Sequence, residues 1–235
     1  MAKINIKPKA AWRARSSFVL GVSMGSQNHV GEALEAIINQ INNGSFTDGI
    51  IDLSDTLNRY RYLAEGKTMA EATAIARNEG NRWLEDNGHI LSKLTVPTAI
   101  RRWDEWLNHP EYSTAREQYK KLYKSNPSLR LAIDQDIENF YARNYGVAEI
   151  TKTMRSLSTK YYLEELAVQT LILTEKSSTV MYPGKQLECF KLIRSGKIAD
   201  APTSLVNSPY ARLVVHSFVR PPAANQNKAM VAALT

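Results

Sequence analysis

Ser23 stands in a pattern that can make a serine nucleophilic. The segment Gly21-Val-Ser-Met-Gly25 satisfies G-x-S-x-G and lies between an apolar run and a helical pattern. Such a turn exposes the hydroxyl at a sheet edge, beside helix-start amides that stabilise an oxyanion. The alternative is a serine that only ends a strand. Hydrolases of the usual α/β kind build several strands before this elbow, whereas only about 16 residues precede the strand that leads to Ser23. An ordinary esterase is therefore disfavoured, and other serine chemistry stays open.

A carboxylate and a phenol share one face of a predicted helix. Residues on this face follow each other at steps of three and four: Met154, Leu157, Tyr161, Glu165, Val168 and Ile172. Burying Glu165 alone is costly, so a hydrogen bond or a bound group must satisfy it. Tyr161 lies one turn earlier, and a pair of this kind suits an ammonium group. The alternative is a helix edge in solvent, where Glu165 pairs with a lysine.

The elements predicted around these residues alternate between strand and helix. Residues 17–23 and 49–53 are apolar runs typical of strands buried on both faces, and residues 30–41 between them have helical spacing. This order predicts one βαβ unit with a right-handed crossover. Further strands are predicted at 94–100, 178–182 and 212–219, and further helices at 68–87, 111–124, 127–145 and 147–174.

One α/β domain over residues 1–235 accounts for this pattern, since the sequence has no internal repeat. Residues 1–16 are interpreted as a basic lead-in and residues 221–235 as a mobile tail. Apolar residues make up 43% of the chain and charged residues 23%, as in an average globular protein. A chain this long can bury a core without a disulfide or a metal.

Several classes of site and location are disfavoured by the residues present. Gly66-Lys67-Thr68 resembles the end of a phosphate-binding loop, but position 61 is arginine where that loop needs glycine. The histidines have no metal-ligand spacing and Cys189 is the single cysteine, so we expect neither a metal site nor a disulfide. The sequence has no secretory signal pattern at its start and no apolar run of the ~20 residues that span a bilayer. We therefore expect a cytoplasmic protein.

The charge balance is basic, with 30 Lys and Arg against 23 Asp and Glu and a net charge of +7. Five Lys and Arg residues precede the first acid, Glu32. A positive field favours phosphate-rich partners. The alternative is a basic surface without a nucleic-acid partner, so the charge raises this hypothesis without deciding it.

Three short segments, in this order, resemble those of the tRNA-dependent cyclodipeptide synthases. They are Gly21-Val-Ser23, Tyr161-Tyr-Leu-Glu-Glu165 and Met181-Tyr-Pro183. Each is weak alone, but the ordered set is fairly specific, and the likeness covers nearly the whole chain. One branch of the family has asparagine three positions after the serine, where this chain has Ser26. The Tyr182-Pro183 pair resembles the other branch.

The resemblance implies a fold and a set of substrates. The expected fold is a single Rossmann-like domain, a mostly parallel sheet flanked by helices, similar to the catalytic domains of class I tyrosyl- and tryptophanyl-tRNA synthetases. The ATP-binding signatures of those enzymes are absent from the sequence. The resemblance implies aminoacyl-tRNAs as the substrates. Because their ester is already activated, no activation by ATP is needed, and we expect no cofactor and no metal. Family likeness also implies a monomer.

The resemblance also implies roles for individual residues. Ser23 would take an aminoacyl group from a first tRNA, in a ping-pong mechanism that ends in a cyclic dipeptide. Tyr161 and Glu165 would hold its α-ammonium group, and Tyr182 would position the serine or the aminoacyl group. The expected substrate-binding positions are Gly21, Val19, Ile51, Ser26 and Pro183.

The tRNA surface is less clearly marked. Relatives often have a markedly basic helix after the second strand, but here that helix mixes both signs of charge. The candidate contacts are instead the basic N-terminus or Arg101, Arg102, Lys120, Lys121 and Lys124. Two other functions stay open: a serine esterase or acyltransferase, with His216 as the base, and a noncatalytic tRNA-binding domain.

Overall fold

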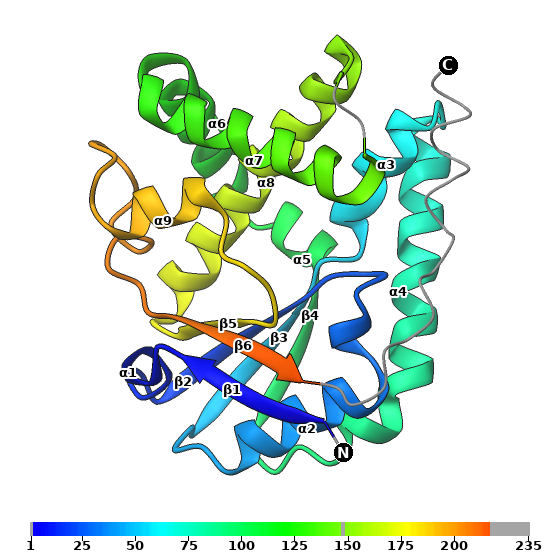
Figure 1. Ribbon diagram of the computed structural model, residues 1–235, viewed down its shortest axis with the longest axis vertical. Helices are drawn as coiled ribbons and strands as arrows, with labels where there is room; N and C mark the ends of the chain where they lie inside the picture. The colour runs from blue at the N-terminus through cyan, green and yellow to red at the C-terminus, as the bar shows by residue number, and fades with distance from the viewer. Residues whose placement is uncertain (1, 147–148, 217–235) are drawn as a thin grey trace.

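Apolar strands form the centre of the protein, whose computed structural model is shown in Figure 1 and describes residues 2–146 and 149–216. The strands of the described sheet are β1 (Lys3–Lys7), β2 (Ser17–Val22), β3 (Asp48–Leu53), β4 (Thr98–Arg102), β5 (Thr179–Tyr182) and β6 (Tyr210–His216). They lie in the order β1-β6-β5-β2-β3-β4. Neighbouring strands are parallel except for β1, which pairs with β6 in the antiparallel direction. The predicted α/β class and mostly parallel sheet are therefore confirmed.

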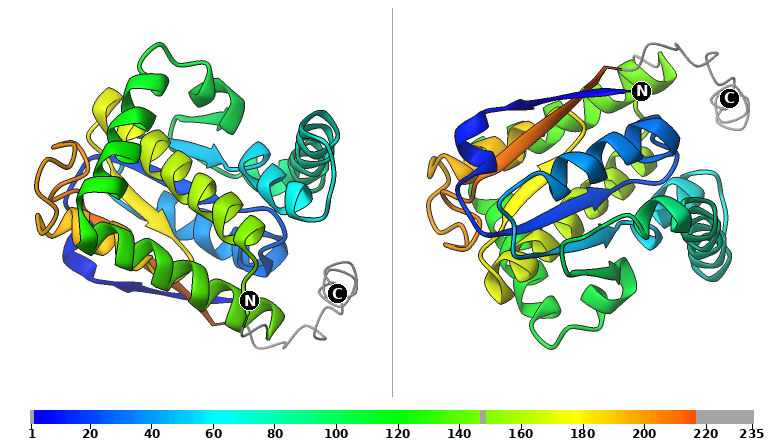
Figure 2. Two further views of the ribbon diagram at one scale, coloured as in Figure 1. Left: turned by 90° about the horizontal axis from the view of Figure 1, so that it is seen from above. Right: turned by 90° about the horizontal axis from the view of Figure 1, so that it is seen from below.

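Helices cover both faces of the sheet. Those in the first half of the chain are α1 (Lys9–Trp12), η1 (Gln27–His29), α2 (Gly31–Asn42), η2 (Thr56–Asn58), α3 (Arg59–Ala64) and α4 (Met69–Leu91). Those that follow β4 are α5 (Trp103–Leu107), α6 (Tyr112–Ser125), α7 (Pro127–Tyr145), α8 (Lys152–Glu175) and α9 (Glu188–Arg194). Seen from above, α7 and α8 cross one face, and from below α2 crosses the other (Figure 2).

The residues of each strand alternate between two cores. Val19 and Ile50 pack in the core that contains α8, whereas Leu20 and Ile51 pack in the core that contains α2 and α4. This follows from the pleat of a strand, which points successive side chains to opposite faces. Because both faces are covered at the centre of the sheet, β2 is apolar almost throughout, whereas the edge strands β1 and β4 have exposed and half-buried residues.

The order of the strands creates a switch point between β2 and β5. From β2 the chain continues outward to β3 and β4, and then returns to the other side of β2 to build β5 and β6. The connections therefore leave β2 and β5 in opposite directions, which opens a crevice at the carboxyl ends of these two strands. Ser23 directly follows β2, and Tyr182 is the last residue of β5.

Most predicted elements are confirmed, with shifted ends. Helix α7 has the predicted bounds, and α4 begins after Thr68, whose side chain forms a capping box with Glu71. Strand β4 lies later than predicted, at Thr98–Arg102, because the chain pairs with β3 only after Pro97.

Other parts of the prediction were wrong or lie outside the described residues. The interpretation of residues 1–16 as a lead-in was wrong, since they contain β1 and α1. The predicted tail at 221–235 and the last residues of the predicted strand 212–219 lie outside the described residues, as do residues 147 and 148 of a predicted helix. None of the described helices combines the length and apolarity needed to cross a membrane.

Candidate active site

A hydrogen bond joins two hydroxyl groups across the switch point. Ser23 Oγ lies 3.1 Å from the Tyr182 hydroxyl, and both side chains are partly exposed. Burial raises the pKa of Tyr182 above its ordinary value, although the bond to Ser23 opposes the shift. Tyr182 therefore keeps its proton at neutral pH and can donate it to Ser23 Oγ, which holds the serine oxygen in one direction.

A buried histidine fixes the turn that carries Ser23. The Ser23 amide donates to His29 Nδ1 at 3.1 Å, and the carbonyl of His29 accepts from Trp83 Nε1 at 2.8 Å. Burial lowers the pKa of His29 to about 4, so the imidazole is neutral. Its edge also contacts the ring of Tyr182, with 5.5 Å between the centroids. The sequence analysis missed this residue, which supports both members of the hydroxyl pair.

The loop after β5 holds the ring of Tyr182 in place. A side chain at Gly184 would put its Cβ 2.3 Å from Tyr182 Cε1, so glycine is required for this approach. Asn28 Nδ2 donates to the carbonyl of Pro183 at 3.2 Å, and the Tyr210 hydroxyl donates to the carbonyl of Gly184 at 3.1 Å. Residues from η1 and β6 thus fix the segment in which Pro183 was predicted to act.

Glu165 lies on α8, and its fully buried Oε2 has no hydrogen-bond partner among the described residues. Burial, together with the charges of Asp52 and Asp136, raises the pKa of Glu165 to about 8, and the charge of Arg194 opposes this shift. Glu165 and Tyr182 are also among the charges that raise the pKa of Tyr161, after burial. The three predicted side chains therefore lie in one electrostatic environment. Within the part of the chain that the structure describes, no lysine pairs with Glu165.

The neighbouring carboxylate, Glu164, differs from Glu165 in that both of its oxygens have hydrogen-bond partners. Its two oxygens accept hydrogen bonds from four side chains, at 2.6 to 3.1 Å: Arg59, Tyr60, Trp103 and Tyr112. It is fully buried and ties α3, α5 and α6 to α8. Glu164 thus has a structural role, whereas Glu165 has an unused buried acceptor.

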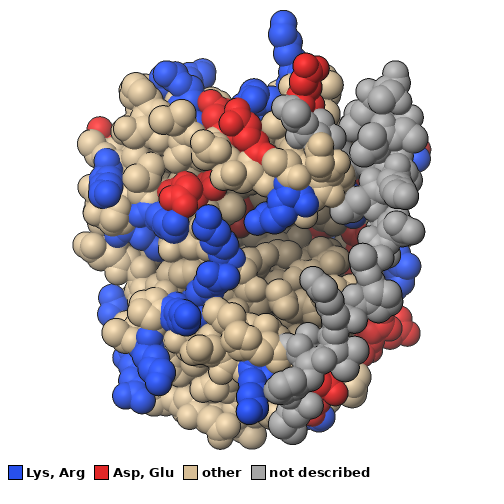
Figure 3. Space-filling model, viewed as in Figure 1, with Lys and Arg blue, Asp and Glu red and all other residues tan. Residues whose placement is uncertain are grey.

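Gly21 has no side chain, so it leaves open space in the site between Ser23 and the core. A Cβ at this position would meet one atom within 4 Å, Tyr182 Cδ2 at 3.5 Å, which is an ordinary contact. Val19, two residues earlier, is fully buried on the same face of β2. The space-filling view is hollowed between the helices at the top and the sheet below (Figure 3).

Solved structures share this arrangement of elements over nearly the whole chain. A CDPS (cyclodipeptide synthase) from Fluoribacter dumoffii superposes with a TM-score of 0.82 at 24% identity, covering 92% of this chain and 100% of its own. The chain has the cyclodipeptide synthase fold. The cyclodipeptide synthase from Candidatus Glomeribacter gigasporarum, bound to Phe-tRNAPhe, gives a TM-score of 0.68 at 19% identity, with coverages of 89% and 92%.

A third structure relates this fold to the predicted synthetase-like architecture. A Mycobacterium tuberculosis protein gives a TM-score of 0.66 at 14% identity, with coverages of 90% and 92%, and is described as demonstrating that cyclodipeptide synthetases are related to type I tRNA synthetases. No family model and no curated protein matches the sequence. The assignment to the Tyr-Pro branch of the family stays a prediction.

One residue predicted to line the substrate pocket of this cyclodipeptide synthase fold faces the other side of the sheet. Ile51 is fully buried in the core on the α2 and α4 side of the sheet, away from Glu165. Its neighbours Ile50 and Asp52 face the α8 side instead. Ser26 precedes η1, and its hydroxyl makes no hydrogen bond within the described residues. Asp52 was missed, although a carboxylate inside an apolar strand is an unusual residue that could have been noticed.

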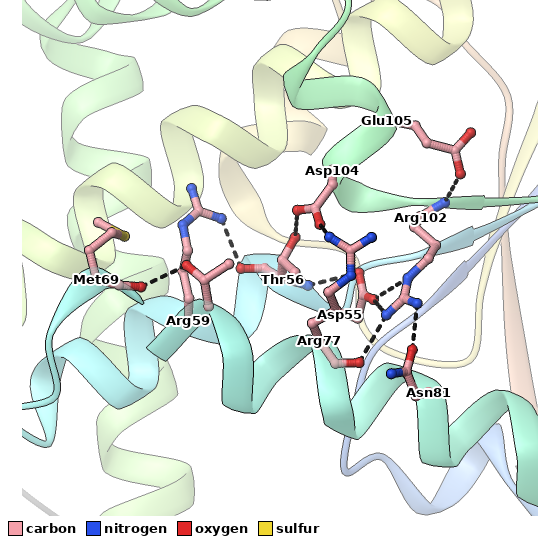
Figure 4. A network of polar contacts seen from close by, with 10 residues as sticks. Asp55, Thr56, Arg59, Met69, Arg77, Asn81, Arg102, Asp104 and Glu105 are labelled. Atoms are coloured by element: carbon pink, nitrogen blue, oxygen red, sulfur yellow. Dashed lines mark hydrogen bonds and ion pairs between the residues drawn. The ribbon is translucent and has the colours of Figure 1, made fainter. Parts of the chain in front are cut away.

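The predicted tRNA contacts have different surroundings. Arg102 is used inside the protein: it pairs with buried Asp55 and donates to Asn81 and to the carbonyl of Arg77 (Figure 4). Its assignment to the tRNA surface stays a prediction, weakened by these partners inside the protein. Arg101 pairs with Glu175 at 2.8 Å, and Lys120 pairs with Glu117. Lys121 and Lys124 are exposed on α6.

No histidine bonds to the Ser23 hydroxyl in the described part of the chain. His216 ends β6, four residues beyond the level at which Arg212 pairs with Tyr182, so it is not beside Ser23. His29 contacts the serine through backbone atoms. The described residues contain no cluster of His, Cys, Asp and Glu that could hold a metal ion. The serine esterase hypothesis therefore lacks its base at this site.

Proposed function

We propose that this protein is a cyclodipeptide synthase, which joins the aminoacyl groups of two aminoacyl-tRNAs into a cyclic dipeptide. The observation that carries the proposal is the Ser23–Tyr182 hydrogen bond, which lies at the switch point of a fold shared with cyclodipeptide synthases. One protein of this fold is bound to Phe-tRNAPhe, which supports aminoacyl-tRNAs as substrates. The basic net charge of +7 suits the same partner.

Ser23 is the nucleophile of the first step. Its Oγ attacks the carbonyl carbon of the aminoacyl ester, the Oγ–C bond forms, and the ester bond to the tRNA breaks. The serine proton passes to the leaving ribose oxygen, so free tRNA departs and an aminoacyl-serine ester remains. Tyr182, which stays protonated, directs the attack by holding Oγ. The ester supplies the activation, so this step needs neither ATP nor a cofactor.

Glu165 and Tyr161 bind the α-ammonium group of the acyl-enzyme. The ammonium group supplies the donor that buried Oε2 of Glu165 lacks, and the opposite charge favours ionised Glu165. The carboxylate can then take a proton from the ammonium group. The resulting amine attacks the ester of a second aminoacyl-tRNA, a peptide bond forms and the second tRNA leaves. The new terminal amine attacks the serine ester, which closes the ring and frees Ser23.

Exposed lysines on α6 form the proposed tRNA contact. Lys121 and Lys124 are exposed on this helix and form no ion pair within the described residues, so a phosphate can approach both. Arg101 and Lys120 are weaker candidates, because each already has a carboxylate partner. Lys and Arg side chains are also spread over the face shown in Figure 3.

Mass spectrometry of bacterial culture medium tests this function. A host that expresses the protein supplies every common aminoacyl-tRNA, so new cyclic-dipeptide masses are expected in the medium. Ser23→Ala should abolish them while the protein stays folded, because the acyl-enzyme no longer forms. Ser128→Ala, at an exposed serine of α7, is the matched control and should leave the products unchanged. Normal output from Ser23→Ala would exclude the covalent mechanism.

A further inference from the structure

Three buried acceptor oxygens around the site have no hydrogen-bond partner among the described residues. They are Asp52 Oδ2, Glu165 Oε2 and Gln169 Oε1. Gln169 lies one helical turn after Glu165 on α8, and the charge of Asp52 acts on Glu165. Buried polar atoms are nearly always hydrogen-bonded, and leaving one unpaired costs about 1–3 kcal/mol. Unused acceptors on β3 and on one face of α8 indicate a ligand that brings several donors.

Asp52 is the best placed of these groups after Glu165. It is fully buried on β3 and lies directly beside Gly21 of β2 in the sheet register. Trp106 Nε1 donates to Oδ1 at 3.1 Å, which fixes the carboxyl group and leaves Oδ2 unused. Neighbouring strands are about 4.8 Å apart, so Oδ2 is near the space that Gly21 leaves open. A group attached to Ser23 and extending along Gly21 would meet Asp52.

The α-ammonium group alone does not satisfy this set of acceptors. In the proposed function that group binds Glu165 and Tyr161, on the helix side of the site. Asp52 lies on the sheet side, beside the residue whose missing side chain provides room for the acyl group. The remaining donor must therefore come from another part of the aminoacyl group, and its side chain is the part that reaches past Gly21.

We propose that Asp52, assisted by Gln169, selects a first aminoacyl group whose side chain carries an N–H or O–H donor. The inference rests on the proposed function, since it concerns the group that Ser23 receives. Both a cationic and a neutral donor side chain satisfy the chemistry, and the mass of the product distinguishes them. Burial and nearby carboxylates raise the pKa of Asp52 to about 7, which a bound donor or cation would reverse.

A structural role for Asp52 does not explain the choice of residue. An asparagine at this position could accept from Trp106 through its amide oxygen, without burying an ionisable group. Asp52→Asn therefore separates the two roles: it keeps the Trp106 bond and turns an N–H toward the site in place of an acceptor. Asp52→Leu removes both. A merely structural residue would change the amount of product in these variants, not its identity.

The test compares the cyclic dipeptides made by wild-type protein, Asp52→Asn and Asp52→Leu in the same host, with thermal unfolding of each purified protein. Wild-type products should contain a donor-bearing residue. In Asp52→Asn the share of that residue should fall about tenfold or more, as expected when a site built for a donor loses its acceptor. Asp52→Leu should shift the products toward apolar residues. Asp48→Asn, on the same strand and paired with Lys176 at the other end, is the control and should not change the products.

Each contrary result has its own meaning. Cyclic dipeptides with only hydrocarbon side chains, or the same product identities in wild type and both Asp52 variants, would overturn this inference and leave the proposed function standing. The absence of any cyclic dipeptide from folded wild-type protein would overturn the proposed function and this inference with it. If Asp52→Leu fails to fold, the product ratio of Asp52→Asn decides.

Discussion

At the scale of single residues, two adjacent carboxylates on α8 separate stability from function. Glu164 has four hydrogen-bond donors, including the guanidinium group of Arg59 at 2.6 Å. Glu165 has a fully buried oxygen that accepts no hydrogen bond from any described residue. The sequence pattern of α8 identified Glu165 through its apolar face but contained no sign of Glu164's role. The partners of Glu164 come from three elements distant in sequence, so only the fold brings them together.

The same substitution at these two positions should have opposite effects. Glu164→Gln leaves the buried Arg59 charge without its carboxylate, so the free energy of unfolding should fall by about 3–5 kcal/mol. Glu165→Gln removes an unpaired carboxyl group, so it should not lower stability, but it should abolish most cyclic-dipeptide formation. Chemical denaturation and product analysis of both variants check this. A large loss of stability in Glu165→Gln would contradict the account of its environment.

The raised pKa of Glu165 predicts how the difference in the free energy of unfolding between wild type and Glu165→Gln depends on pH. In the folded protein its pKa is about 8, whereas the ordinary value is 4.5. Below about pH 4.5 both states hold the proton and the residue has no effect. Between about pH 4.5 and 8 the unfolded state loses its proton and the folded state does not, so wild-type stability falls as pH rises. Glu165→Gln lacks this loss, and denaturation at pH 5 and pH 8 should show its advantage grow by at least about 1 kcal/mol. A constant difference would contradict the prediction.

At the scale of elements, local signals predicted some segments well and others not at all. Helix α7 is bounded by Pro127 and Gly146, and α4 by the Thr68 cap, so both could be predicted from sequence. Strand β1 has exposed and half-buried residues, and its partner β6 follows about 200 residues later, so no local pattern reveals it. A strand buried on both faces also conceals which residue faces the site, which is why Ile51 was predicted there and Asp52 was missed.

Two glycines of α4 should respond oppositely to the same substitution. A Cβ at Gly80 would lie 2.5 Å from Asp55 Oδ2 and 2.9 Å from Arg102 Nη2, and Asp55 is fully buried. Gly80→Ala should therefore lower the free energy of unfolding by about 1–3 kcal/mol. A Cβ at Gly88 meets nothing within 4 Å, so Gly88→Ala should raise it by about 0.5–1 kcal/mol. Urea denaturation of both variants tests the close packing of α4 on η2 and β4, and equal effects would contradict it.

At the scale of the whole molecule, topology assembles the site from distant segments. Ser23 and Tyr182 are 159 positions apart in sequence, and α8 adds Glu165 from above the sheet. The sequence contained the residue types and their order, and these sufficed for the family resemblance. The contacts of His29, Gly184 and Asp52 depend on strand order and register, which single segments do not encode. The basic charge is likewise a property of the whole molecule. It predicts the class of partner, but not which face of the protein binds that partner.

The most direct test of the central claim is the intact mass of the purified protein after brief incubation with a mixture of aminoacyl-tRNAs. We expect a mass increase equal to one aminoacyl group, located on the peptide that contains Ser23 and absent from Ser23→Ala. A second addition of aminoacyl-tRNA should then remove the group as cyclic dipeptide. Product formation by Ser23→Ala, or an acyl group carried on another residue, would contradict the central claim.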